Sequence, residues 1–108
     1  MNVPKVIAEI GCNHKGDINI AREMIMTAAT YCKADIVKFQ KRCNKELLTP
    51  EEYNAPHPNP YNSYGKTYGE HREFLEFNLE QHRQLQLPNL FISRHKIVTH
   101  FTNPLRLY

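Results

Sequence analysis

Two short apolar segments of this 108-residue chain each carry side chains that can do chemistry. Glu9 lies within the first segment, and Lys38 and Gln40 lie in the second, about one helix-length further along the chain. A carboxylate can stabilise a reacting centre, a lysine ammonium suits phosphate, and an amide can hydrogen-bond a polyol. The structural alternatives are an ion pair between Glu9 and Lys38 and an ordinary strand-end amide at Gln40.

A strand–helix–strand unit is the predicted frame for these groups. The apolar runs predict buried strands over residues 5–10 and 36–40, both of them central strands of a parallel sheet. Because the carboxyl ends of parallel strands meet at one edge, we expect the polar side chains to converge there. Asp17 is expected to cap a helix that ends near Cys32. Its core-facing stripe is predicted to be Ala21, Met24, Ile25, Ala28, Ala29 and Cys32.

The turn after the first predicted strand contains Asn13 and His14. Gly11 and Gly16 enclose this turn and indicate backbone angles that other residues avoid. Asn13 and His14 either cap the backbone of the turn or contact a ligand. Cys12 and His14 have no second pair at zinc-binding spacing, so we expect no metal site within this chain.

The middle of the chain, residues 41–66, reads as a long polar connection rich in Pro, Asn and Tyr. Thr49 is predicted to cap a short helical turn within it. Further helices are expected over residues 67–77 and, capped by Asn78, over residues 79–87.

Composition narrows the class of protein. With 41% hydrophobic and 23% charged residues, the chain fits the soluble globular class. The net charge of +3 is dispersed, so we expect no nucleic-acid partner. No apolar run is long enough for a membrane span, so no membrane partner is expected, and the start lacks the pattern of a secretory signal. Three cysteines without a CxxC pair are typical of the cytoplasm.

Three segments together resemble the opening of the sialic acid synthase family, which includes N-acetylneuraminate, legionaminate and pseudaminate synthases. Residues 8–17 read Ala-Glu-Ile-Gly-Cys-Asn-His-Lys-Gly-Asp, and residues 34–42 read Ala-Asp-Ile-Val-Lys-Phe-Gln-Lys-Arg. Residues 62–77 contain the Tyr-Gly-Glu motif of the family within Asn-Ser-Tyr-Gly-Lys-Thr-Tyr-Gly-Glu-His. The resemblance covers about residues 3–86.

This resemblance implies a (β/α)8 barrel, of which the chain would hold the N-terminal third. It implies condensation of phosphoenolpyruvate with an N-acetylated hexosamine, a divalent metal (Mn²⁺ or Mg²⁺) and, in full-length members, a homodimer. Residue by residue, it assigns Glu9 to the reacting centre, Lys38 to the phosphate, and Gln40 and Asn62 to the sugar. The metal ligands of the family have no counterpart in this chain.

The chain departs from the family in two places. The family usually carries Gly-Ala-Asp before the second strand, where this chain has Lys33-Ala34-Asp35, a change expected to affect the left-handed helix cap rather than chemistry. The tail also departs. Leu90–Ser93 begins like a third strand, which Arg94–Lys96 and Asn103-Pro104 are expected to interrupt.

We therefore divide the chain into residues 1–87, an incomplete barrel, and residues 88–108, an atypical tail that a shift of reading frame would explain. The expected protein is a truncated and poorly active synthase, since catalysis needs groups from several strands. Two alternatives stay open. One is a small non-catalytic binding or interaction module, and the other is a different phosphoenolpyruvate-dependent aldol synthase. The motifs do not tell which sugar is the acceptor.

Overall fold

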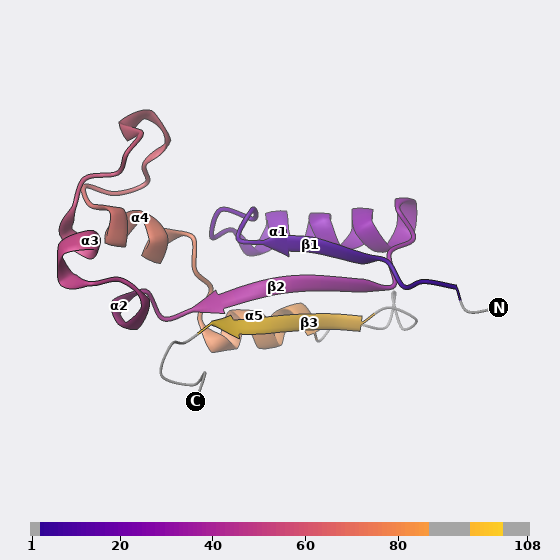
Figure 1. The fold of residues 1–108 in the computed structure, drawn as a ribbon. Coiled ribbons are helices and arrows are strands. Elements are labelled where there is room, and N and C mark those ends of the chain that lie inside the picture. The colour runs from indigo at the N-terminus through magenta and orange to yellow at the C-terminus, as the bar shows by residue number, and fades with distance from the viewer. Residues whose placement is uncertain (1–2, 87–95, 103–108) are drawn as a thin grey trace.

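The computed structural model describes residues 3–86 and 96–102, which form a three-stranded parallel sheet with helices on one face (Figure 1). Strands β1 (Ile7–Gly11), β2 (Ile36–Arg42) and β3 (Lys96–Thr102) lie in the order β1-β2-β3. All three run in the same direction, so their carboxyl ends lie at one edge of the sheet. The predicted parallel strand–helix–strand unit is confirmed.

Helix α1 (Ile18–Met26) begins where the sequence predicts, because the side chain of Asp17 accepts hydrogen bonds from two amides of its first turn. One turn of π-helix, η1 (Thr27–Tyr31), continues it. Cys32 ends the helical segment and is exposed, so its predicted place in the core stripe is wrong. The stripe is otherwise confirmed, with Met24 partly buried and four residues fully buried: Ala21, Ile25, Ala28 and Ala29.

The residue after this helix end adopts left-handed backbone angles. Lys33 has a φ of 54°, a conformation that costs a side-chain-bearing residue about 1–2 kcal/mol. This is the position where the sequence departs from a glycine. The departure therefore falls on the helix cap, as expected.

The core lies between the sheet and helices α1 and α5 (Leu79–Gln86), which lie behind the sheet in Figure 1. Phe39 of β2 is fully buried there, together with Phe77 and Leu85. In the described sheet β1 is an edge strand and not the central strand that the sequence predicts. Ile7 is 54% exposed, because β1 is the edge strand of the described sheet and its other face carries no described helix.

Residues 43–78 extend beyond the carboxyl ends of the strands (Figure 1). They form α2 (Asn44–Leu47), α3 (Pro50–Asn54), the 3₁₀ turn η2 (Pro60–Asn62) and α4 (Tyr68–Phe74). Thr49 caps α3 in a reciprocal capping box with Glu52, which confirms the predicted helical turn. The helix predicted over residues 67–77 is shorter than expected. Asn78 caps α5 in the predicted way and accepts a hydrogen bond from the amide of Gln81.

The third strand of the described sheet is β3, which begins at Lys96. Leu90–Ser93, where it was expected to begin, lies outside the described residues. Lys96, expected to interrupt the strand, instead begins β3, which pairs with β2 from Ile36↔Lys96 to Arg42↔Thr102. The β-branched run Ile97-Val98-Thr99 favours this extended conformation.

Candidate functional site

Pairing of β1 with β2 brings Glu9 and Lys38, the third residue of each strand, together. The two residues are register partners, and Lys38 Nζ lies 3.0 Å from Glu9 Oε2. Their side chains are 30% exposed for Lys38 and 50% exposed for Glu9. A pair this exposed stabilises a fold by only about 0–1 kcal/mol. The ion pair considered as a structural alternative is therefore present, but both charged groups remain open to solvent.

Gly11 marks the point where the polar groups converge. The ladder between β1 and β2 has an irregularity between Glu9 and Gly11, and Gly11 then turns the chain with a φ of 59°. A Cβ atom placed on Gly11 would lie 3.6 Å from both Gln40 Oε1 and Glu9 Oε1, and 4.0 Å from Asn13 Nδ2. Side chains from β1, β2 and the turn after β1 thus lie within 4.0 Å of one point beside Gly11.

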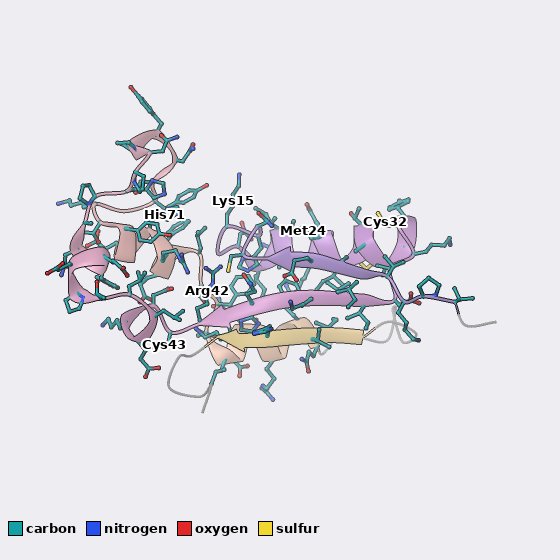
Figure 2. All side chains as sticks on the ribbon, in the orientation of Figure 1. Lys15, Met24, Cys32, Arg42, Cys43 and His71 are labelled. Carbon is teal, nitrogen blue, oxygen red and sulfur yellow. The ribbon has the colours of Figure 1, made fainter. Side chains whose placement is uncertain are left out.

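Arg42 belongs to the same cluster, although the sequence analysis did not single it out. It lies at the carboxyl end of β2 (Figure 2), and its Nη2 donates hydrogen bonds to Gln40 Oε1 at 3.1 Å and to Cys12 Sγ at 3.2 Å. The two-residue period of a strand places residues 38, 40 and 42 on one face, a signal that was available.

Glu76 is the second residue that the sequence analysis missed. Its side chain is only 5% exposed and lies against two cations, with Lys41 Nζ at 3.5 Å and Arg42 Nε at 3.6 Å. It also accepts a hydrogen bond from the backbone amide of Arg42 at 3.1 Å. Residues 42 and 76 are far apart in sequence, and no local pattern indicates this contact.

Asn13 and His14 both bind the turn that contains them. Asn13 Nδ2 donates to the carbonyl of Ile10 at 2.8 Å, and His14 Nδ1 accepts from the amide of Gly16 at 3.0 Å. His14 is fully buried, and its ring stacks on that of Phe77 with centroids 3.8 Å apart. Of the two roles left open by the sequence, the structure displays backbone capping for both residues, and ligand contact stays a prediction.

Burial controls the protonation of His14. Its removal from water lowers the pKa from 6.5 to about 4, and the nearby His82 contributes in the same direction. Since Nδ1 accepts a hydrogen bond, the ring proton of the neutral form resides on Nε2, which has no hydrogen-bond partner among the described residues. His14 is therefore a neutral core residue at physiological pH.

Asn62 lies apart from this cluster. It is exposed in η2, on the connection between α3 and α4 that extends away from the strand ends (Figure 1). Of the four residues assigned by resemblance, the structure thus brings together Glu9, Lys38 and Gln40. The sugar-binding role of Asn62 stays a prediction.

A parallel α/β unit with polar groups at the carboxyl ends of its strands is a common frame for ligand-binding sites. The sequence profile of the NeuB family matches residues 24–104, which is most of the chain. The chain belongs to the NeuB family. The match extends well into residues 88–108, and the division at residue 87 and the shift of reading frame stay predictions.

Curated relatives share substantial sequence with this chain. The N-acetylneuraminate-9-phosphate synthases of Mus musculus and Homo sapiens are 46% and 44% identical to it over 81 residues, covering 75% of this chain. The N,N'-diacetyllegionaminic acid synthase of Campylobacter jejuni is 34% identical over 82 residues. These matches cover only 22–24% of the relatives, so the chain spans about a quarter of their length or less.

The fold also matches a solved structure. The crystal structure of N-acetylneuraminic acid (sialic acid) synthetase from Leptospira borgpetersenii, in complex with citrate, superposes with a TM-score of 0.66 at 24% identity. The match covers 98% of this chain and 32% of that one. It establishes a shared fold over this part. No helix among the described residues combines the length and apolar character needed to cross a bilayer.

Proposed function

We propose that the chain supplies the first part of an enzyme that condenses phosphoenolpyruvate with an N-acetylated hexosamine to form a sialic acid-like sugar. Membership of the NeuB family and the names of the relatives support this reaction. The observation that carries it is the solvent-open pair of Glu9 and Lys38 beside Gln40. On the same grounds we propose that β1, β2 and β3 are the first strands of a (β/α)8 barrel.

Each side chain has a proposed role in the reaction. The Lys38 ammonium binds the phosphate of the donor, and Gln40 and Asn62 hydrogen-bond the sugar. The methylene carbon of phosphoenolpyruvate forms a bond to the aldehyde carbon, whose oxygen takes up a proton. The Glu9 carboxylate stabilises the cation left at the enolpyruvyl carbon. Water adds to that carbon with loss of a proton, and phosphate leaves by C–O cleavage.

A divalent metal, Mn²⁺ or Mg²⁺, is proposed for longer members of the family. Among residues 3–86 and 96–102, no group of three or more His, Cys, Asp or Glu side chains is placed to hold such an ion. The residues present do not fit a metal centre, and no step above depends on one. A homodimer and a cytoplasmic location are likewise proposals.

Binding of phosphoenolpyruvate by the 108-residue chain tests the role of Lys38. We expect calorimetric titration to detect binding that Lys38→Ala weakens at least tenfold, since a charge-assisted hydrogen bond contributes about 1.5–3 kcal/mol. Lys45→Ala is the matched control, because Lys45 is exposed on α2 rather than at the strand ends. Equal affinities of the two variants would refute the phosphate role.

A chimera tests the reaction itself. Residues 3–86 would replace the corresponding segment of the Campylobacter jejuni legionaminic acid synthase, and phosphate release would be measured with the sugar substrate of that enzyme. We expect activity that Lys38→Ala abolishes and Lys45→Ala retains. An inactive chimera that folds would contradict the proposed function of these residues.

A further inference from the structure

The orientation of the Gln40 carboxamide is fixed by a neighbour on its own strand. Arg42 Nη2 donates to Gln40 Oε1 at 3.1 Å. A guanidinium has only donors, so an inverted carboxamide would place its NH2 group against an N–H. That arrangement loses the hydrogen bond and sets two donors against each other. The oxygen of Gln40 is therefore held on the Arg42 side.

Arg42 is itself held by contacts to two other segments. Its Nη2 also donates to Cys12 Sγ at 3.2 Å, in the turn after β1. Its backbone amide donates to Glu76 Oε2 at 3.1 Å, between α4 and α5. Arg42 Nε lies 3.6 Å from Glu76 Oε1, which is an ion-pair distance but too long for a hydrogen bond.

The burial of Glu76 makes this arrangement rigid. A carboxylate that is only 5% exposed needs its cationic partners, because an unpaired buried charge is strongly destabilising. Lys41 and Arg42 both supply such a charge. A shift of the whole Arg42 guanidinium away from Gln40 would therefore also weaken the pairing of a buried carboxylate.

We propose that Arg42, held by Glu76, is a positioning residue that presents the NH2 group of Gln40 to the acceptor sugar and so selects a hydrogen-bond acceptor at that point. The proposal rests on the proposed function, in which Gln40 binds the sugar. The carbonyl oxygen of an acetamido group accepts this hydrogen bond, whereas a free ammonium only donates. The site thereby favours an N-acetylated amino sugar over the corresponding free amine.

The first experiment uses no sugar. The ¹³C resonance of the Gln40 side-chain carbonyl, which responds to hydrogen bonding at Oε1, is compared in the wild-type chain and in Arg42→Ala. We expect it to move in Arg42→Ala and to stay in place in Arg83→Ala, whose exposed arginine pairs with Glu80 on α5. An unmoved carbonyl resonance in a folded Arg42→Ala chain would overturn the proposal whatever the sugar does.

The second experiment measures selectivity as the ratio of the affinities for N-acetylmannosamine and mannosamine. We expect the side-chain NH2 signals of Gln40 to shift with the first sugar, and Arg42→Ala to lower the ratio about tenfold, the effect of roughly 1.4 kcal/mol. Arg42→Met, which keeps an apolar stem but has no N–H donor, supplies the same test if the alanine variant does not fold, because Lys41 remains beside Glu76. A purely structural role would lower the melting temperature and leave the ratio unchanged, which would overturn the proposal.

The two experiments separate this proposal from the function on which it rests. Binding of neither sugar to the wild-type chain, with a carbonyl resonance that still moves in Arg42→Ala, would contradict sugar binding by Gln40 while supporting the fixed orientation of its carboxamide. Sugar binding with an unchanged ratio in Arg42→Ala would support the function and refute the role of Arg42.

Discussion

Acidification should destabilise this protein through His14. The folded state holds the imidazole neutral, with a pKa lowered from 6.5 to about 4 by burial and by His82. Between these pH values only the unfolded chain binds the proton, so acid favours unfolding. The stability that comes from keeping His14 neutral is fully present above pH 6.5 and is lost as the pH falls toward 4. Linkage lowers the free energy of unfolding by about 2–3 kcal/mol between pH 7.5 and 4.5, out of a typical stability of about 5–15 kcal/mol.

Urea denaturation followed by circular dichroism at several pH values measures this change in the free energy of unfolding. Carboxylates also titrate near pH 4.5, so the wild-type chain is compared with His14→Gln, whose amide oxygen can still accept the hydrogen bond from Gly16. We expect the acid-induced fall in the free energy of unfolding to be about 2–3 kcal/mol smaller in His14→Gln. His100→Gln, at an exposed position of β3, is the matched control. Its free energy of unfolding should fall with acid by as much as that of the wild-type chain.

Direct titration of His14 by NMR in the wild-type chain completes the test, even if the glutamine variant does not fold. A midpoint near 6.5 would refute the reasoning, because a fully buried ring should not titrate like one in water. An absence of any cooperative unfolding transition at pH 7.5 would refute its premise. The burial of His82 lowers its pKa in the same direction, with a smaller contribution from Lys41.

Two further predictions concern backbone conformation. Gly16→Ala should lower the urea midpoint by more than Gly11→Ala does. A Cβ on Gly16 would clash with the carbonyl oxygen of Phe74, whereas the nearest atoms to a Cβ on Gly11 lie 3.6 Å away. The left-handed φ of residue 11 alone should make Gly11→Ala less stable by about 1–2 kcal/mol. Equal losses of stability in the two variants would contradict the close approach of Phe74 to Gly16. Lys33→Gly should stabilise the chain by about 0.5–1 kcal/mol, because glycine adopts a φ of 54° without strain; a lower melting temperature would contradict this.

The sequence predicts the first strand–helix–strand unit well because its signals are local. Asp17 stands where a helix must satisfy free amides, and the glycines at 11 and 16 both have positive φ. Strand direction then brings Glu9 and Lys38 together without further information, since a crossover helix makes the two strands parallel. The part of the site that depends on this unit could therefore be predicted.

The rest of the site could not be predicted because it depends on contacts that are distant in sequence. Glu76 reaches Arg42 from the connection between two helices, and its burial follows only from how those helices pack. Exposure of β1 likewise depends on what covers the strand. An apolar sequence indicates that a face can be buried, but not which segment covers it. The inclusion of Lys96 in β3 was not predicted for a related reason, because it depends on pairing with the distant strand β2.

The geometry of the Glu9–Lys38 pair also bears on the anion binding proposed for Lys38. At 3.0 Å and with both side chains partly exposed, the pair stabilises the fold by about 1 kcal/mol at most. A phosphate that carries up to two negative charges can therefore compete for Lys38 at small cost. The displaced carboxylate then remains beside Lys38, where a cation that develops on the substrate would meet an unpaired negative charge. An exposed, weakly bound ion pair is suited to this exchange, whereas a buried one would resist it.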